Sequence, residues 1–359
     1  MSVSLQDVFA ADQAIRPHIR QTPLVPSASL SALTGAEIRI KLDFLQDTGA
    51  FKLRGATNRL LALSREERER GVIAVSTGNH GRAVAAAAAR LGIRAAVVMS
   101  SLVPEVKVDG VRQFGAEVRI AGNSQDEADA EAARLIAAEG LVAVPPFDDP
   151  HVIAGQGTIG LELLRDWPSM QAVLIPLSGG GLLAGVARVL KAANPAIRII
   201  GISLGKGGAM AESLKAGRPI DVTEPETLAD SLGGGIGLQN RHSFEMVRAL
   251  ADDIVTVDDD EIARAMGYLF WNDRLVVEGA GAVAAAALIE GKVPGIGRGL
   301  DRIACLSCGN MVDMSRFFEI VGAHHPGASA NISTGSAPAP AANSSDSSNQ
   351  EASECPVAG

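Results

Sequence analysis

One lysine in this sequence has neighbours that favour chemistry over a solvated surface position. Lys52 follows an aromatic residue and lies between Gly49 and Gly55, in the run TGAFKLRG at residues 48–55. A lysine that lies near another cation, here Arg54, or in an apolar site loses its proton more readily. It can then act as a nucleophile, a base or a Schiff-base former. The alternative is a surface lysine on a helix.

Two more glycine-containing clusters follow predicted strands. The run STGNHG at residues 76–81 places consecutive polar side chains before a predicted helix, which suits an anion or a carboxylate. Plain N-capping of that helix is the alternative. The run SGGGLLAG at residues 178–185 lets successive backbone N–H groups approach a phosphate, unless these glycines only turn the chain. Its spacing also fits a loose dinucleotide fingerprint. That fingerprint needs an acidic residue about 20 residues later, where Ser203 and Leu204 stand instead.

A fourth cluster, CLSCGN at residues 305–310, ends the last predicted strand. A C-x-x-C pair can bind zinc or take part in redox chemistry. However, the sequence has no second cysteine pair and no histidine at a finger-like spacing. We therefore favour a strand-end site that offers the Ser307 hydroxyl to a ligand, and we expect no metal. The third cysteine, Cys355, is expected to be a bystander.

Composition limits the classes of function. The 359 residues include 32 Lys and Arg against 41 Asp and Glu, so the net charge is −9, and aromatic residues make up only 3%. An acidic chain with few aromatics is a poor nucleic-acid binder. At the start of the sequence we see no basic stretch followed by an apolar one, which a secretion signal would have. No apolar run approaches the length of roughly 20 residues that spans a bilayer. Three cysteines form no disulfide framework. These features predict a cytoplasmic protein without nucleic-acid or membrane partners.

Alternating β-branched runs and helical patterns predict an α/β fold, with mostly parallel sheets covered on both faces. The expected strands are 72–76, 95–99, 117–120, 141–144, 172–176, 198–203, 254–257 and 302–306. The expected helices are 80–91, 104–114, 125–139, 151–165, 182–193, 259–271 and 280–290. Another helix is expected to begin near Lys52, with Asp47 or Thr48 as its N-cap.

A break near Pro145 and Pro146 divides this alternation into two runs, which predicts two domains with a cleft between them. The predicted small domain is 47–147, and the large domain is 1–46 together with 148–325. Residues 326–359 are polar and contain only two large aliphatic side chains, Ile332 and Val357. A segment of this composition cannot bury enough apolar surface to offset its ordering entropy. We expect this tail to be disordered and to carry no chemistry.

The four clusters, in this order, resemble the fold type II pyridoxal-phosphate enzymes, and most closely the serine/threonine dehydratase and serine racemase family. Three further runs are similar to that family: FDDPHVIAGQGT at 147–158, LADSLGGG at 228–235 and EGAG at 278–281. The resemblance covers roughly residues 5–320. It implies two open, mostly parallel twisted sheets flanked by helices, as in the tryptophan synthase β chain, and a pyridoxal 5'-phosphate cofactor.

The resemblance also implies a role for each matching residue. Lys52 would carry the Schiff base with the cofactor and take the Cα proton of the substrate. Phe51 would pack beside the cofactor ring, Asn79 would bind its 3′-oxygen, and Ser307 would face its nitrogen. The other implied cofactor contacts are Ser178, Gly179, Gly180, Gly181 and Leu182 around the phosphate, with Gly233 and Glu278 near the ring. The implied substrate contacts are Ser76, Thr77, Asn79 and His80.

The implied reaction is β-elimination of water from a threonine- or serine-like amino acid, giving a 2-oxo acid and ammonia. The lack of a C-terminal regulatory domain favours a catabolic enzyme. Thr77 stands where racemases have a serine, and Ser203 with Leu204 stands where cation-binding members have Glu-Pro. The runs at 76–82 and 231–237 look most like the hydroxyectoine utilization dehydratases. The family makes a homodimer the expected assembly.

Two other classes of function stay open. The first is an amino-acid racemase or a β-replacement synthase on the same fold. The second is a non-catalytic nucleotide-binding module built on the glycine run at 179–181, which would leave Lys52 without a role.

Overall fold

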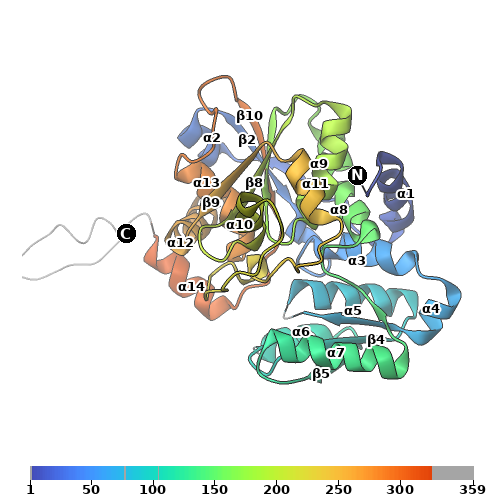
Figure 1. The fold of residues 1–359 in the computed structure, drawn as a ribbon. Coiled ribbons are helices and arrows are strands. Elements are labelled where there is room, and N and C mark those ends of the chain that lie inside the picture. Colours follow the sequence, from blue (N-terminus) through green and yellow to red (C-terminus); the bar gives the residue numbers. More distant parts are fainter. Residues whose placement is uncertain (1, 77, 104, 326–359) are drawn as a thin grey trace, which may run out of the picture. The chain divides into compact units, whose positions relative to one another are not determined.

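Two sheets, each flanked by helices, organise the chain (Figure 1). The computed structural model describes residues 2–76, 78–103 and 105–325. The large sheet has the strand order β1 (Leu24–Pro26), β2 (Glu37–Leu42), β10 (Arg302–Ser307), β7 (Ala172–Pro176), β8 (Arg198–Leu204) and β9 (Asp253–Val257). The small sheet has the order β5 (Glu117–Ile120), β4 (Ala95–Met99), β3 (Val72–Val75) and β6 (Val142–Ala143). Neighbouring strands are parallel, apart from β1 against β2.

The helices cover both faces of each sheet. In chain order they are α1 (Leu5–Ile15), α2 (Ala28–Thr34), α3 (Lys52–Leu61), α4 (Arg65–Arg70), α5 (Asn79–Leu91), α6 (Glu105–Arg112), α7 (Gln125–Glu139), α8 (Pro150–Asp166), α9 (Gly181–Ala193), α10 (Ala209–Ala216), α11 (Ser243–Leu250), α12 (Asp259–Tyr268), α13 (Gly279–Ile289) and α14 (Met314–Ala323). Shorter turns are η1 (Arg16–His18), η2 (Asp43–Leu45), η3 (Asp230–Leu232) and the π-helical η4 (Leu269–Asp273). In Figure 1, α8 and α9 lie on one side of the large sheet and α12 and α13 on the other.

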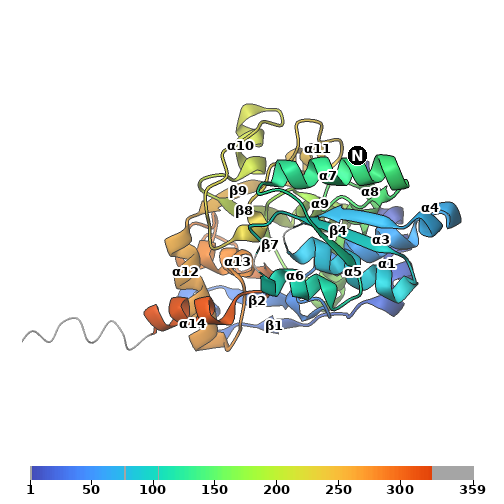
Figure 2. The same ribbon diagram turned by 90° about the horizontal axis from the view of Figure 1, so that it is seen from below.

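The small sheet shows the two-residue period of a strand buried on both faces. In β4, Ala96 and Val98 pack with α7, whereas Val97 and Met99 pack with α5 and α6. Figure 2 shows α7 and α5 on opposite sides of β4. This double burial explains why β3 and β4 read as continuous apolar runs in the sequence, as parallel strands do. The expected α/β fold with two mostly parallel sheets is confirmed.

Most predicted elements form within two residues of their expected bounds, and the differences have physical causes. Strands β1 and β2 were not predicted. The first is only three residues long, and charged residues interrupt the run EIRIKL of the second; one of these, Lys41, is fully buried. The helix expected over 259–271 ends at Tyr268 and continues as the π-helical turn η4. The helix expected over 104–114 is shorter, as α6, and Pro104 lies outside the described residues.

The expected N-cap of the lysine helix was wrong. Helix α3 begins at Lys52, its N-cap is Phe51, and no side chain caps it. Asp47 instead forms ion pairs with Arg20 and Arg90. Residues between Asp47 and the helix are held by strand-like pairing, because Ala50 forms an antiparallel bridge with Gly309. The start of α3 is therefore fixed by the main chain that follows β10.

Met1–His325 form one compact unit, in which the two sheets have separate apolar clusters. The division into a small domain of 47–147 and a large domain of 1–46 with 148–325 stays a prediction. The expected disordered tail, 326–359, lies outside the described residues, as does its Cys355. In the part of the chain that the structure describes, no helix has the length and apolarity to cross a membrane.

Candidate active site

The first site residue, Lys52, lies where α3 meets the end of β10. Its Nζ donates a hydrogen bond to the main-chain oxygen of Pro146 at 2.7 Å and lies 5.2 Å from the centre of the Phe51 ring. Burial lowers the pKa of Lys52 to about 8, against a smaller opposing effect of Cys308. The amine is thus substantially neutral in mildly alkaline solution.

The expectation that Arg54 lowers the pKa of Lys52 was wrong. The Arg54 guanidinium is fully buried and forms ion pairs with Asp43 and Glu162, both at 2.7 Å. Two carboxylates beside one guanidinium leave no excess positive charge to act on the lysine. The loss of solvation at Lys52 itself is the cause of the shift.

The main chain before Lys52 is tied to residues that follow β10. The N–H of Phe51 donates to the oxygen of Cys308 at 3.0 Å, and the N–H of Asn310 donates to the oxygen of Gly49 at 3.0 Å. Gly49 has φ +75, and a Cβ there would lie 2.5 Å from the sulfur of Met311. Only glycine therefore fits this turn, which explains its place shortly before the start of α3.

The glycine run 178–181 forms the entry to α9. Gly180 is the N-cap, with φ +87, and Gly181 is the first helical residue. A Cβ on Gly179 would collide with the ring of Phe147, and one on Gly181 would lie 2.7 Å from the Phe147 carbonyl oxygen. The first N–H groups of a helix have no intrahelical acceptor. This turn therefore presents free donors at the positive end of a helix dipole, which suits a phosphate.

Neighbouring residues extend this glycine turn. Ser178 donates from Oγ to the main-chain oxygen of Gly233 at 3.5 Å, which brings the run at 228–235 beside it. Leu182, the second residue of α9, is buried in the core of the large sheet. No role was predicted for Phe147, which begins the motif at 147–158; its position directly after the two prolines is the signal that could have marked it.

A carboxylate and an amide meet opposite the start of α5. Glu278 is the N-cap of α13, and its Oε1 accepts hydrogen bonds from Asn79 Nδ2 and Ser231 Oγ, both at 2.8 Å. Its Oε2 accepts from the N–H of Met311 at 3.2 Å. Burial raises the pKa of Glu278 to about 7, although the Ser231 hydroxyl and the Asn79 amide oppose the shift. Ser231 lies in the motif at 228–235, and no role was predicted for it.

His80 is buried one residue further along α5. Its Nε2 donates to the main-chain oxygen of Val144 at 2.8 Å, while its buried Nδ1 has no hydrogen-bond partner. Burial, followed by the charge of Lys52, lowers the pKa of His80 to about 3. The imidazole is therefore neutral, and its Nδ1 is an acceptor available to a ligand.

The remaining residues of the polar run have different positions. Ser76 accepts at Oγ from the N–H of Gly78 at 3.3 Å, and Gly78 is the N-cap of α5 without a side-chain hydrogen bond. The side chains of this run that the structure describes are thus not used as helix caps, which was the alternative interpretation. Thr77 lies outside the described residues.

Ser307 and the two cysteines line the end of β10. Ser307 is buried and donates from Oγ to the oxygen of Gly281 at 2.9 Å. Cys305 and Cys308 are free, buried thiols, and burial raises the pKa of both. Both thiols pack in the core beside the serine.

These contacts connect the described candidate residues through a few segments. Lys52, His80 and the glycine turn all touch residues 144–147. Asn79 reaches Glu278, whose side chain would collide with a Cβ on Gly309, two residues after Ser307. The strand ends and helix starts of both sheets thus meet in one region, as the rule for open α/β sheets requires.

Comparison with known proteins agrees with this geometry. The model of the family described as pyridoxal-phosphate dependent enzyme matches residues 15–309. This chain belongs to that family, and it uses pyridoxal phosphate.

Three curated relatives cover nearly the whole described chain. A Sinorhizobium fredii protein, provisionally named as a threonine dehydratase, is 50% identical over 320 residues (89% of this chain, 96% of that protein). The L-threonine ammonia-lyase of Thermotoga maritima is 40% identical over 319 residues (89% and 78%). The catabolic L-threonine dehydratase of Escherichia coli K12 is 38% identical over 322 residues (90% and 97%). The chain is therefore a pyridoxal-phosphate-dependent lyase of the dehydratase type.

Solved structures share the fold closely. Maize serine racemase superposes with a TM-score of 0.84 at 33% identity, covering 90% of this chain and 98% of that chain. A solved threonine deaminase from tomato, Solanum lycopersicum, superposes with a TM-score of 0.81 at 36% identity, covering 89% and 91%. The implied fold type is therefore confirmed.

The described residues fit this cofactor. An amine whose pKa is lowered to about 8 lies near the glycine turn, where Gly179 and Gly181 have no room for a Cβ. The free N–H groups there suit its phosphate. The hydroxyl of Ser307 offers a neutral partner for a ring nitrogen.

Proposed function

We propose that this enzyme eliminates water from threonine or serine and releases a 2-oxo acid and ammonia. The observation that carries the proposal is Lys52, a partly neutral amine held at 2.7 Å from Pro146 beside a phosphate-binding turn. The relatives named threonine dehydratase or ammonia-lyase, at 38–40% identity, support this choice of substrate.

We assign the bond to the cofactor and the movement of the substrate proton to Lys52. When bound, pyridoxal phosphate withdraws electrons and acidifies the Cα–H of an attached amino acid. The neutral Lys52 amine can then accept that proton at Nζ. The Pro146 carbonyl stabilises the resulting ammonium, because it already accepts a hydrogen bond from Nζ. His80 stays neutral, and this proton transfer does not need it as an acid or a base.

The cofactor contacts follow from the helix start and the strand end. We assign the phosphate to the N–H groups and hydroxyl of the run 178–182. The ring is assigned to Phe51, Asn79, Gly233, Glu278 and Ser307. Glu278 accepts from the Asn79 amide nitrogen at 2.8 Å, and this contact fixes the direction of the amide as a whole.

We assign the substrate to the start of α5, with Ser76, Thr77, Asn79 and His80 as its contacts and with its carboxylate at the first N–H groups of the helix. The N-terminus of this 13-residue helix carries partial positive charge and N–H donors. The unpartnered Nδ1 of His80 accepts a hydrogen bond, so it suits a donor on the substrate rather than the carboxylate itself.

The decisive assay is the release of 2-oxo acid and ammonia from L-threonine and L-serine. We expect both products in equal amounts, and we expect loss of product when Lys52 is replaced. Racemisation is a second candidate, which the similarity to maize serine racemase favours. Inversion of serine without ammonia would replace the assignment to water elimination, and thioether formation would support a β-replacement synthase.

The substrate side chain is a finer assignment. The predicted hydroxyectoine utilization subgroup stays a prediction. Hydroxyectoine-derived amino acids and hydroxyaspartate belong in the same assay. A kcat/KM for one of them at least tenfold above that for threonine would support the subgroup.

We also propose a cytoplasmic homodimer. Large apolar side chains on the surface include Phe9, Leu33, Leu238, Met314 and Phe318, and exposed apolar surface is typical of subunit contacts where such side chains adjoin. Light scattering on the purified protein tests the dimer, and fractionation of the source cells tests the location.

A further inference from the structure

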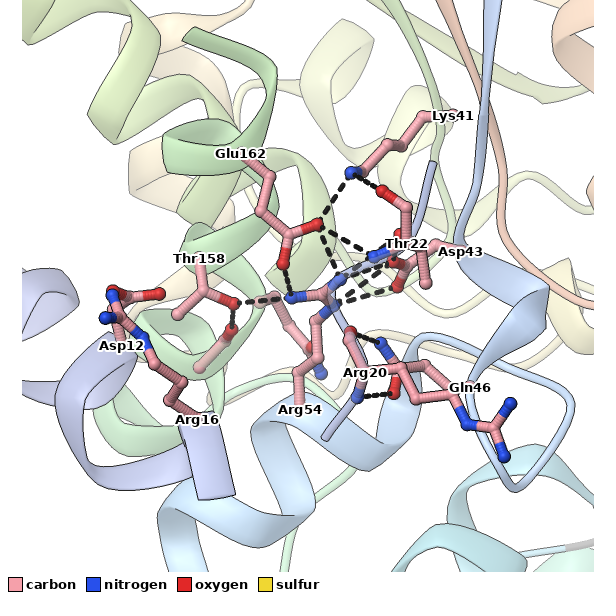
Figure 3. Close-up of polar contacts among 12 residues, drawn as sticks. Asp12, Arg16, Arg20, Thr22, Lys41, Asp43, Gln46, Arg54, Thr158 and Glu162 are labelled. Atoms are coloured by element: carbon pink, nitrogen blue, oxygen red, sulfur yellow. Dashed lines mark hydrogen bonds and ion pairs between the residues drawn. The ribbon is translucent and has the colours of Figure 1, made fainter. Parts of the chain in front are cut away.

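A cluster of buried charges (Figure 3) includes Arg54, two residues after the catalytic lysine in α3. The buried ion cluster consists of Thr22, Lys41, Asp43, Arg54, Thr158 and Glu162. It joins three elements: β2 with η2, which supply Lys41 and Asp43, the first turn of α3, which supplies Arg54, and α8, which supplies Thr158 and Glu162. Arg54 and Lys41 have no exposed surface.

Arg54 uses its full hydrogen-bonding capacity in this cluster. Nε donates to Asp43 at 3.1 Å, and Nη2 donates to Asp43 at 2.7 Å and to Glu162 at 3.0 Å. Nη1 donates to Glu162 at 2.7 Å and to Thr158 at 3.1 Å. Nη2 also lies 3.3 Å from Thr22 Oγ1, so all five N–H groups of the guanidinium have acceptors within reach. Figure 3 shows the planar group held between the two carboxylates.

This arrangement determines the direction of Lys52. Arg54 is two residues after Lys52 in α3, and successive helical residues turn by about 100°. The two side chains therefore leave the helix on nearly opposite faces, with Lys52 toward Pro146 and Arg54 toward the buried ion cluster. No side chain caps α3, so the side-chain contacts of Arg54 and the pairing of Ala50 with Gly309 hold its first turn.

The packing of α3 on α8 makes the position rigid. A Cβ on Gly155 would lie 2.7 Å from the Cα of Gly55, so the two backbones touch. The N–H of Gly55 also donates to Gln156 Oε1 at 3.2 Å. Helices in backbone contact cannot shift closer, and the Arg54 contacts prevent rotation.

Charge balance explains why a network is used here. Two cations, Lys41 and Arg54, face two anions, Asp43 and Glu162, with Asp166 a further contact at 3.7 Å from Lys41. A buried ion pair adds little net stability relative to apolar packing, but its hydrogen bonds are directional. The cluster therefore contributes a fixed orientation of its side chains more than it contributes stability.

We propose that Arg54 is a positioning residue, which orients Lys52 toward the cofactor and keeps its amine desolvated. This proposal rests on the proposed function of Lys52, but not on the identity of the substrate.

The test is the conservative variant Arg54→Lys, which keeps the charge and loses the planar fork. Full-length protein is freed of cofactor by dialysis against cysteine, which takes the aldehyde from Lys52, and is checked by circular dichroism. It is then labelled with an amine reagent over a range of pH values from mildly acidic to strongly alkaline. Mass spectrometry of the Lys52 peptide gives its apparent pKa. We expect about 8 in the wild type and a clearly higher value, by roughly one unit or more, in Arg54→Lys. With substrate, we expect kcat to fall at least tenfold while KM changes less than threefold.

Arg198→Lys is the matched control, because Arg198 pairs with Asp253 at 2.5 Å on the large sheet, away from α3. It should leave the labelling pKa and kcat unchanged. If Arg54→Lys does not fold, Thr158→Val decides, since it removes one uncharged partner of Nη1. A raised Lys52 pKa in that variant supports the proposal.

Two results overturn the positioning role: a folded Arg54→Lys variant with wild-type labelling, or a wild-type value in Thr158→Val when Arg54→Lys fails to fold. Labelling uses no substrate. Inactivity of the wild type toward threonine and serine would thus disprove the proposed function and leave the positioning result interpretable.

Discussion

The amine of Lys52 donates to the carbonyl of Pro146, two residues after the carbonyl of Val144 that accepts from His80. One short segment thus holds two candidate site residues that come from α3 and α5. Pro145 and Pro146 have no N–H, so this segment presents acceptors and no donors at those positions to the amine. The lysine is held by an oxygen that cannot itself take up or release a proton near neutral pH.

The first prediction concerns attachment of the cofactor. Because only a neutral amine bonds to an aldehyde, the rate of attachment to cofactor-free protein should rise about tenfold per pH unit at low pH and level off above pH 8, where Lys52 is neutral. Absorbance after mixing with pyridoxal phosphate gives the rate. A rate that keeps rising to about pH 10.5 would mean that Lys52 has an ordinary pKa.

Replacing the lysine should abolish turnover while the protein stays folded. Lys52→Ala is expected to lose about 10³-fold or more of kcat, as expected when a nucleophile or base is removed. Borohydride should attach the cofactor to the Lys52 peptide in the wild type and to no peptide in the variant. Lys215→Ala is the control, because the Lys215 side chain is 69% exposed. Equal losses in the two variants would contradict a catalytic role for Lys52.

Gly181→Ala should weaken cofactor binding at least tenfold, which is about 1.4 kcal/mol. Its Cβ would lie 2.7 Å from the carbonyl oxygen of Phe147, and a main-chain atom cannot move aside as a flexible side chain can. Equilibrium dialysis measures the affinity. At Gly322, in α14, an added Cβ meets no atom within 4 Å, so Gly322→Ala should bind the cofactor normally and gain stability. Normal binding by Gly181→Ala would exclude the phosphate cradle.

Glu278→Gln should change how stability depends on pH. The folded state raises the carboxyl pKa from 4.5 to about 7, so the folded protein binds this proton more tightly than the unfolded chain. The stability contributed by this proton is present below pH 4.5 and is lost as the pH rises through 7. Relative to Glu278→Gln, the wild type should lose about 3 kcal/mol across this pH range.

Urea unfolding of cofactor-free protein at several pH values measures this difference. Glu319→Gln is the matched control, since that side chain is 68% exposed, and it should follow the wild type. Parallel curves for the wild type and Glu278→Gln would show that Glu278 is ionised in the folded protein throughout this range.

Sequence patterns singled out the lysine, the glycine turn, the polar run and the strand-end serine as candidates, because these signals are local. They could not reveal the buried ion cluster, whose members are distant in sequence: Arg54 and Glu162 are 108 residues apart, and Lys41 and Glu162 are 121 apart. For the same reason Arg54 was interpreted as a charge acting on Lys52. Its effect depends on two carboxylates that only the fold brings to it.

The segment after the two prolines was also beyond local reasoning. The amino-acid types at residues 144–148 do not show that two carbonyl groups of this segment accept hydrogen bonds from site residues. Nor do they show that Phe147 packs against the glycine turn, or that Asp148 accepts from the N–H groups of Arg241, His242 and Ser243 at 2.7–2.8 Å. Such contacts depend on how the two sheets meet.

The position of β10 has a consequence for biosynthesis. It is the last strand along the described chain, yet it lies between β2 and β7 and joins the N-terminal pair of strands to the other three. Arg302 of β10 pairs with Glu37 of β2, and the two residues are 302 − 37 = 265 positions apart in the sequence. Such long-range pairing slows folding. While the chain is on the ribosome, the small sheet can form first, whereas the large sheet must wait for Ser307, where β10 ends. Because the turn before Lys52 also pairs with residues that follow β10, a nascent chain can neither fix Lys52 nor complete its binding site until synthesis has passed this strand.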